Sequence, residues 1–302
     1  MGSSDSAATT ARPGRLACWV MAARPKTLAA AAIPVLVGTA VAYDQGSFAL
    51  VAALAALVGA GLIQIGTNFA NDFFDAESGA DNEDRLGPTR VVQAGLLSAR
   101  SVKWATAASF GLAALVGIYL VILGGWPILV VGVASILAGL AYTGGPYPLG
   151  YNGLGDVFVF VFFGLVAVVG TFYVQALSLS WEPLIAALPV GFLSTAILVV
   201  NNYRDIDTDR AAGKNTLAVR LGRRGTRWQY ALLVAGAYLV PLLQWATGGP
   251  ATLLLPLLSA PLAVVTGRAM WTRRGADLNP VLARTAGVLA VFGVLYAVGY
   301  WL

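Results

Sequence analysis

Two stretches of the sequence place carboxylates and amides on one face of a helix. In the first stretch Asn68, Asp72 and Asp75 stand at i, i+4 and i+7, a spacing that brings them onto a shared helical stripe. A similar pattern returns 133 residues further along the chain, at i, i+4 and i+8, in the residues Asn201, Asp205 and Asp209. Each stripe follows an apolar run, so both sets are expected at the ends of apolar helices.

Both acidic stripes weaken the helices that carry them, which points to a function. Like charges at i, i+3 or i+4 destabilise a helix by roughly 0.2–0.5 kcal/mol, and carboxylates near a helix C-terminus oppose its dipole. If these acids were solvated loop residues, the asparagine at i−4 in both copies would have no explanation. Facing Asp clusters bind hard divalent cations, and Mg²⁺ fits better than Ca²⁺ because it keeps waters and accepts phosphate oxygens. The sequence therefore predicts Mg²⁺ as cofactor and a polyanion as ligand.

Cationic side chains stand near both acidic stretches, as a metal-bound polyanion requires. Those expected to contact it are Arg24, Lys26, Arg85, Arg90, Arg204 and Lys214. The alternative is that they are ordinary cytoplasmic anchors of a membrane protein, and both interpretations stay open. The chain has no histidine and a single cysteine, Cys18, so an internal disulfide is excluded and a zinc or iron site is not expected.

The elements that must position these residues are membrane helices. Apolar residues make up 58% of the chain and charged residues 11%, and the mean hydropathy is +0.75, which is not the composition of a soluble domain. Nine apolar runs are long enough to cross a bilayer core of about 30 Å. They cover residues 27–45, 47–70, 102–123, 125–142, 153–173, 182–201, 228–247, 251–268 and 281–302. The predicted fold class is an all-α integral membrane protein with nine transmembrane helices.

All 19 Lys and Arg residues fall on one side of this arrangement, in the N-terminal segment and in the loops after helices 2, 6 and 8. The opposite loops carry only Asp44 and Glu182. The positive-inside rule makes the basic side cytoplasmic, with the N-terminus and both acidic stretches, and leaves the C-terminus external. This basic face attracts membrane lipid. No nucleic-acid partner is expected, and the oligomeric state stays open.

The two acidic stretches each close an even-numbered helix, with four helices from one to the other. This order predicts an internal repeat of helices 1–4 and 5–8 around a central cavity. Residues 1–15 are small and polar and are expected to form a disordered tail. Residues 16–302 are expected to form a single transmembrane domain.

The motifs Asn71-Asp72-x-x-Asp75 and Asp205-x-x-x-Asp209 resemble the two aspartate-rich segments of the UbiA superfamily of intramembrane aromatic prenyltransferases. Within it, the chain looks most like the branch of 1,4-dihydroxy-2-naphthoate polyprenyltransferases. Four stretches carry this likeness, residues 23–40, 71–95, 142–156 and 201–222. The resemblance implies transfer of a polyprenyl group from polyprenyl diphosphate to 1,4-dihydroxy-2-naphthoate with loss of CO₂ and diphosphate. The product would be demethylmenaquinone, made for menaquinone biosynthesis in a bacterial cell membrane.

The resemblance also implies roles for individual residues. The metal ligands of the family correspond here to Asp72, Asp75, Asp81, Asp205 and Asp209. Its diphosphate site corresponds to the basic residues named above together with Asn68, Asn71, Asn201 and Asn202. The segment 142–156 carries no Lys or Arg, although many relatives place a basic residue a few positions after the tyrosine at its start, so one diphosphate contact of the family is missing here.

Two residues of the segment 142–156 each have two interpretations. Tyr142 either presents its aromatic face to the allylic cation, as a catalytic residue, or belongs to the aromatic belt at the membrane interface. Asp156 either orients a hydroxyl of the acceptor or caps the N-terminus of the helix that follows.

Other functions share parts of this pattern. A prenyltransferase that accepts 4-hydroxybenzoate or homogentisate would have the same metal site, because the acceptor pocket is not visible in the sequence. A divalent-cation transporter also places carboxylates at a membrane mouth. It requires polar residues through the helices to the far side, where this chain has little besides Gln175 and Gln244.

Overall fold

The protein is almost entirely helical. The computed structural model describes residues 13–79 and 86–302, and these two ranges contain no β-strand. Most of the predicted tail, residues 1–15, lies outside them, and Arg15 begins the first helix. The all-α part of the predicted fold class is therefore confirmed.

The first five helices precede the long segment 142–154. In chain order they are α1 (Arg15–Ala23), α2 (Pro25–Asp44), α3 (Leu50–Glu77), α4 (Ala99–Gly124) and α5 (Trp126–Ala141). A single residue, Gly125, joins α4 to α5 with a φ of 71°, a backbone conformation that glycine adopts without strain. The two helices therefore form a tight hairpin.

The rest of the chain begins with a helix of mixed type. The short α6 (Gly155–Val159) runs directly into the π-helix η1 (Phe160–Val166) and then into α7 (Ala167–Ala176). The remaining elements are α8 (Trp181–Arg204), α9 (Ile206–Ala211), α10 (Leu217–Ala246), the 3₁₀ helix η2 (Ala251–Ser259), α11 (Ala260–Thr272), the 3₁₀ helix η3 (Gly275–Leu278) and α12 (Asn279–Trp301).

The outer surface of the helices suits a lipid environment. Eight helical segments within the described ranges are long and apolar enough to cross a membrane. On α10, the side chains of Leu232, Leu239 and Leu243 are all more than half exposed and do not line the cavity described below, which is unfavourable in water and favourable in lipid. The chain is therefore an integral membrane protein. α5 has 16 residues, about 24 Å at 1.5 Å per residue, so the ninth span stays a prediction.

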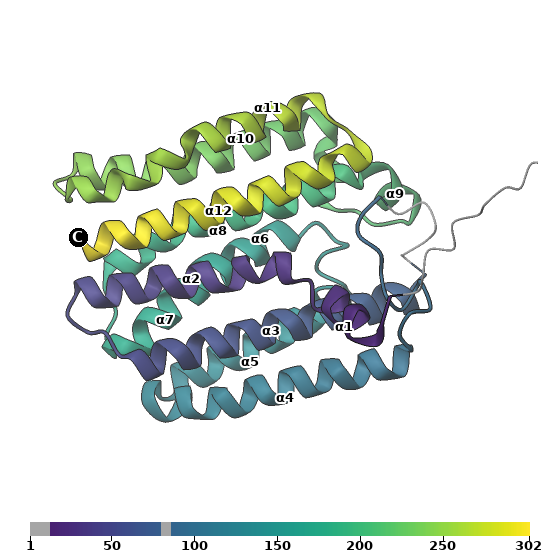
Figure 1. The fold of residues 1–302 in the computed structure, drawn as a ribbon, viewed down its shortest axis with the longest axis horizontal. Helices are drawn as coiled ribbons and strands as arrows, with labels where there is room; N and C mark the ends of the chain where they lie inside the picture. The colour runs from purple at the N-terminus through teal and green to yellow at the C-terminus, as the bar shows by residue number, and fades with distance from the viewer. Residues whose placement is uncertain (1–12, 80–85) are drawn as a thin grey trace, which may run out of the picture.

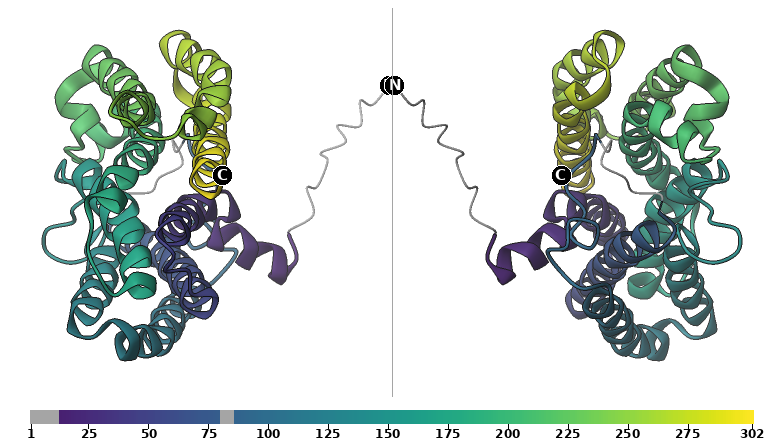
Figure 2. Two further views of the ribbon diagram at one scale, coloured as in Figure 1. Left: turned by 90° about the vertical axis from the view of Figure 1, so that its left-hand side faces the viewer. Right: turned by 90° about the vertical axis from the view of Figure 1, so that its right-hand side faces the viewer.

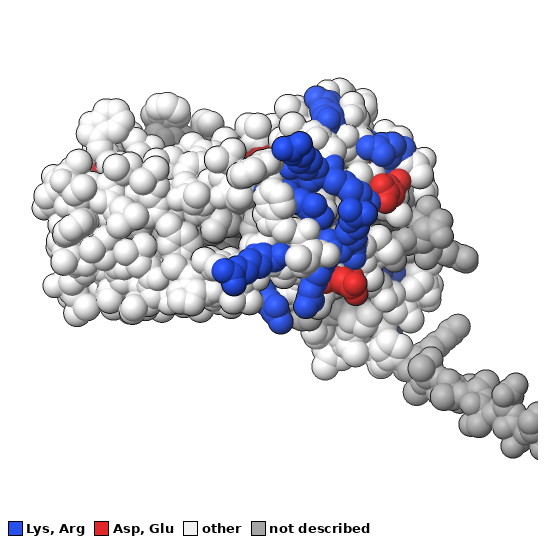
Figure 3. Space-filling model, turned by 90° about the horizontal axis from the view of Figure 1, so that it is seen from above, with Lys and Arg blue, Asp and Glu red and all other residues white. Residues whose placement is uncertain are grey.

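The polar segments gather at one end of the bundle. The helices lie roughly along one direction, with α1 and α9 at one end and the C-terminus at the other (Figure 1). Seen along this direction, the helices are arranged around the molecular axis (Figure 2). On the face formed by α10 and α11, Lys and Arg side chains gather toward the α9 end, and the rest of this face shows almost no charged side chains (Figure 3). Which end faces the cytoplasm, and whether the two halves are a repeat, stay predictions.

Two helix crossings at α2 depend on the absence of a side chain. A Cβ atom on Gly38 would overlap the backbone oxygen of Val168 in α7. A Cβ atom on Gly293 of α12 would overlap the side chain of Ile33 in α2. Small residues allow membrane helices to approach closely and pack by van der Waals contact. These glycines therefore hold α2 between α7 and α12, beside the cavity described below.

Gly38→Ala is expected to lower stability, because the added methyl group must push α2 away from the Val168 backbone. Overpacking of this kind costs about 1–3 kcal/mol. The thermal midpoint of the purified protein in detergent measures the effect. The matched control is Gly61→Ala in α3, where a Cβ meets no atom within 4 Å and alanine is the better helix former. An unchanged midpoint for Gly38→Ala would show that the α2–α7 crossing is loosely packed.

Candidate active site

A cavity of about 770 Å³ runs inside the bundle, and its lining changes from polar to apolar along its length. The apolar part lies between α3, α4, α5, η1 and α7, and extends to Ile122 and Ile128 near the α4–α5 hairpin. The polar end is lined by Arg24, Asn68, Asn71, Asp75, Arg90, Asn201, Asn202, Asp205, Asp209 and Lys214. The two acidic stretches of the sequence thus meet at one end of a single cavity.

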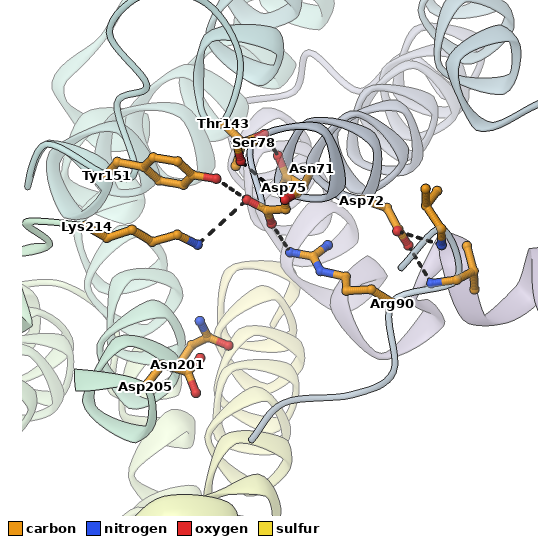
Figure 4. Close-up of polar contacts among 12 residues, drawn as sticks. Asn71, Asp72, Asp75, Ser78, Arg90, Thr143, Tyr151, Asn201, Asp205 and Lys214 are labelled. Atoms are coloured by element: carbon orange, nitrogen blue, oxygen red, sulfur yellow. Dashed lines mark hydrogen bonds and ion pairs between the residues drawn. The ribbon is translucent and has the colours of Figure 1, made fainter. Parts of the chain in front are cut away.

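Asp75 is a buried carboxylate of this polar end with partners from several parts of the chain. Its side chain is 3% exposed, and one oxygen accepts a hydrogen bond of 2.5 Å from Nη2 of Arg90. The other oxygen accepts a hydrogen bond from the hydroxyl of Tyr151 and lies 3.8 Å from Nζ of Lys214 (Figure 4). A carboxylate buried to this degree needs such partners, because burying an unpaired charge costs several kcal/mol.

Tyr151 is a site residue that the sequence analysis missed. Besides its contact with Asp75, its ring lies under Nζ of Lys214, 4.4 Å from the ring centroid, in a cation–π arrangement. In the sequence, the segment 142–156 is distinguished by Tyr142 and Asp156 and by its lack of Lys and Arg, and these features predict no role for Tyr151. The structure shows that this segment supplies a phenol and a cation–π surface. The signal that could have found Tyr151 is a tyrosine in a Gly-rich loop between two apolar helices.

At the second acidic stretch, Arg204 fills a supporting position. Its side chain is 1% exposed and does not line the cavity. Nε and Nη2 donate to the two oxygens of Asp205, at 2.7 and 2.6 Å, and Nη2 also donates to Oδ1 of Asn201 at 2.8 Å. Arg204 was predicted to bind substrate, but its donors already serve residues of the cavity wall. From its position outside the cavity lining, Arg204 orients the side chains of Asp205 and Asn201.

Asp72 also lies outside the cavity lining. It is 1% exposed, and its two oxygens accept hydrogen bonds from the backbone N–H groups of Val91 and Val92, at 3.1 and 3.2 Å. In Figure 4 its carboxylate points away from Asp75 and Asp205. Residues at i and i+3 are offset by about 60° around a helix, and this offset is enough to turn Asp72 toward the loop that carries Arg90.

Asn68 joins α3 to the junction between α1 and α2. Its amide nitrogen donates to the carbonyl oxygen of Ala23 at 2.9 Å and to the hydroxyl of Thr27 at 3.0 Å. Between these partners stands Arg24, which has a φ of 52°, unusual for a residue with a side chain. Asn68 thereby holds the turn that brings Arg24 to the cavity. Asn71 lines the cavity and accepts a hydrogen bond of 2.8 Å from Thr143.

Tyr142 lines the cavity and Asp156 does not. Asp156 lies in the first turn of α6, is 6% exposed and accepts a hydrogen bond of 2.9 Å from Gln229 of α10. This placement, behind the wall and near a helix N-terminus, favours a structural role for Asp156.

Three predicted site residues cannot be placed. Asp81, Arg85 and the side chain of Lys26 lie outside the described part of the protein.

Sequence comparison decides the family. The UbiA prenyltransferase family matches residues 31–291. The chain belongs to this family. A relative from Mycobacterium leprae named 1,4-dihydroxy-2-naphthoate octaprenyltransferase is 43% identical, over 92% of this chain and 94% of its own. A protein of the same name from Escherichia coli is 40% identical, over 95% of this chain and 96% of its own. The resemblance seen in the motifs is thus confirmed, and this UbiA-family chain is a prenyltransferase.

A solved structure shows that the fold is shared. The structure of a UbiA homolog from Archaeoglobus fulgidus bound to DMAPP and Mg²⁺ has a TM-score of 0.63 with this chain. The two are 16% identical, and the match covers 93% of this chain and 99% of that one. The UbiA fold therefore extends over nearly all of the present chain.

The donor set of this UbiA-family site fits Mg²⁺ held jointly with a ligand. Asp75, Asp205 and Asp209 line the same end of the cavity with the amide groups of Asn71 and Asn201, and these are the hard oxygen donors that Mg²⁺ prefers. Within residues 13–79 and 86–302, no three acidic, His or Cys side chains are close enough to hold one ion by themselves. An all-protein cage is not what Mg²⁺ requires, since it usually binds through a few carboxylates, waters and phosphate oxygens.

Tyr151→Phe is expected to lower kcat/KM for prenyl transfer about tenfold, because a hydrogen bond to a charged group contributes about 1.5–3 kcal/mol. The assay is steady-state turnover of the purified enzyme in nanodiscs. Tyr147→Phe, in the same loop, is the matched control, since Tyr147 is 58% exposed and does not line the cavity. Equal losses in both variants would mean that the Tyr151 hydroxyl has no specific effect on Asp75.

Proposed function

We propose that this chain transfers a polyprenyl group from polyprenyl diphosphate to 1,4-dihydroxy-2-naphthoate, in a Mg²⁺-dependent reaction that releases diphosphate and CO₂. The observation that carries the proposal is the cavity itself, whose acidic and cationic end continues into an apolar groove. A polyprenyl diphosphate has the same division, a polyanionic head on a hydrocarbon chain. The relatives named for this naphthoate substrate, at 40% and 43% identity, support the choice of acceptor.

The diphosphate would bind among the cations of the polar end. Arg24, Arg90 and Lys214 all line the cavity, so their charges can offset those of the phosphate oxygens. Tyr151 supports this arrangement through the ring under Lys214. Asn202, 9% exposed, lines the same end and can add an amide donor.

Asp75, Asp205 and Asp209 are the residues that would hold Mg²⁺, with Asn71 and Asn201 as neutral oxygen donors. When bound, the metal supplies Lewis-acid stabilisation of the leaving diphosphate. Asp72 contributes in this proposal by fixing the backbone at Val91 and Val92, one and two residues after Arg90. Arg204 contributes by fixing the orientation of Asp205.

The apolar part of the cavity would protect the reacting carbon. Ionisation of an allylic diphosphate leaves a carbocation, which water would capture unless it is excluded. Tyr142 lines the cavity together with the polar residues, and its ring can stabilise that cation through its negative face. The electron-rich ring of the acceptor then forms the new carbon–carbon bond. Loss of the ring carboxylate as CO₂ returns the electron pair that restores aromaticity, so no protein nucleophile is needed.

We extend the proposal to topology and location. Residues 16–302 would form one transmembrane domain of a bacterial cell membrane. It would have nine spans, and spans 1–4 and spans 5–8, counted in chain order, would form the internal repeat. The gathering of Lys and Arg toward the α9 end supports a cytoplasmic polar end (Figure 3). The position of the C-terminus at the opposite end supports an external C-terminus (Figure 1).

The proposal is tested with purified protein in nanodiscs, Mg²⁺, polyprenyl diphosphate and carboxyl-labelled 1,4-dihydroxy-2-naphthoate, reading prenylated product and released CO₂. Asp205→Asn and Asp75→Asn are expected to lower kcat/KM about 100-fold or more, because they weaken electrostatic stabilisation of the leaving group. Chelation by EDTA is expected to abolish turnover and added Mg²⁺ to restore it.

Asp207→Asn is the matched control for this experiment. Asp207 lies between the two proposed ligands of the second stretch, but it is 71% exposed and pairs with Arg223 at 2.5 Å. Its turnover is expected to match wild type. Turnover with 4-hydroxybenzoate or homogentisate, and none with the naphthoate, would replace the acceptor and keep the metal site. Full activity in EDTA would overturn the role of the metal.

The apolar groove also predicts a limit on donor length. Gly132 of α5 lines the cavity ten residues before Tyr142, about 15 Å along the helix, and a Cβ there meets no atom within 4 Å. Gly132→Leu is therefore expected to narrow the groove and to lower kcat/KM for long polyprenyl diphosphates more than for dimethylallyl diphosphate. Gly111→Leu, on the exposed surface of α4, should leave the ratio unchanged. If Gly132→Leu left the ratio of kcat/KM for long and short donors unaltered, the polyprenyl group would not bind in this part of the cavity.

A further inference from the structure

Asn279, at the start of α12, makes hydrogen bonds with two different parts of the polar end. Its Oδ1 accepts from Nη1 of Arg204 at 2.8 Å, and its Nδ2 donates to the carbonyl oxygen of Leu86 at 3.0 Å. An amide side chain carries an acceptor and a donor on one planar group, whereas an ionised carboxylate or an aliphatic residue cannot make both bonds. Asn279 itself does not line the cavity.

Each of these bonds leads to one of the two acidic stretches. Arg204 continues to Asp205 through two hydrogen bonds, at 2.7 and 2.6 Å. Leu86 stands four residues before Arg90, which donates to Asp75 at 2.5 Å. A continuous path of hydrogen bonds and backbone therefore runs from Asp205 through Arg204, Asn279 and the segment 86–90 to Asp75.

The contact at Leu86 has a second component. A Cβ atom on Gly275, the first residue of η3, would lie 3.8 Å from Cδ1 of Leu86, so the leucine side chain lies against the backbone that precedes α12. The segment 86–90 thus contacts the η3–α12 junction through the hydrogen bond of Leu86 and through the leucine side chain. Asn279 provides the directional part of this contact.

We infer that Asn279 is a positioning residue that sets the relative placement of Asp75 and Asp205. The inference rests on the proposed function, because it assigns the two carboxylates to one metal–diphosphate site. Without the amide, Nη1 of the buried Arg204 loses its hydrogen bond to α12, and the guanidinium can shift together with Asp205 and Asn201, to which it stays bonded. The segment carrying Arg90 loses its hydrogen bond to α12 at the same time. Asp75 and Asp205 are then no longer held in a fixed position relative to each other, although both carboxylates are still present.

The first test is hydrogen exchange on the ligand-free protein, which does not depend on activity. In Asn279→Ala the backbone amides of residues 86, 87 and 89–92 are expected to exchange at least tenfold faster than in wild type, including those of Val91 and Val92. Tyr238→Phe is the matched control, since it removes a hydrogen bond to Ser259 away from the cavity and should leave these amides unchanged. Wild-type exchange in Asn279→Ala would overturn the inference.

The second test is kinetic. Asn279→Ala is expected to raise the half-saturating Mg²⁺ concentration and the KM for polyprenyl diphosphate about tenfold, with the KM for the naphthoate unchanged. Asn279→Gln, which keeps both groups of the amide, should recover part of the loss. A fall in kcat with all three constants unaltered would also overturn the inference. If wild type itself shows no turnover, the proposed function fails, and the exchange result alone decides the role of Asn279.

A further variant covers the case in which Asn279→Ala does not fold. Asn279→Asp keeps an oxygen for Arg204 and replaces the donor to Leu86 by a second acceptor, which cannot bond the Leu86 carbonyl oxygen. Faster exchange in residues 86–92 is again expected, with the thermal midpoint close to that of Tyr238→Phe. A segment that remains protected in Asn279→Asp would show that Leu86 is held by its apolar contact alone, and the inference would be wrong.

Discussion

The arrangement of the polar end depends on the burial of one carboxylate, Asp75. A charge held 3% exposed in a membrane protein is stable only if opposite charges and donors surround it. Its partners come from three separate parts of the chain, Arg90 after α3, Tyr151 after α5 and Lys214 before α10. Asp75 therefore ties together three connecting segments that have no regular structure to hold them.

The cations of the site fall into two groups with different physical roles. The side chain of Arg204 is fixed, because its N–H groups donate to Asp205, Asn201 and Asn279. Arg204 itself does not line the cavity. Arg90 and Lys214 line the cavity and rest on Asp75. The first group shapes the wall, and the second is placed where a ligand can meet it. Net charge alone does not separate these groups, because all three are basic residues close to an acidic motif.

Sequence reasoning predicted the helices, the meeting of the two acidic stretches and most of the polar lining, because apolar run length and helical spacing are local properties. It did not predict which side of its helix each acid faces. Asp72 and Asp75 lie on one broad stripe, yet only Asp75 lines the cavity, and the choice is made by the backbone of Val91 and Val92, a contact between distant segments. Tyr151 was missed for the same reason, since its partners Asp75 and Lys214 are brought to it by the fold.

The pairing of acids with cations has a consequence for ligand binding. A guanidinium or ammonium group that already lies beside a buried carboxylate has lost most of its water, so the cost of desolvation has been met during folding. A phosphate oxygen that takes the place of the carboxylate exchanges one anionic partner for another, and the cation is not moved from water into the protein. This pre-organisation strengthens electrostatic interactions with a bound polyanion. Asp75, which costs stability in its helix, thus keeps Arg90 and Lys214 in position beside the cavity.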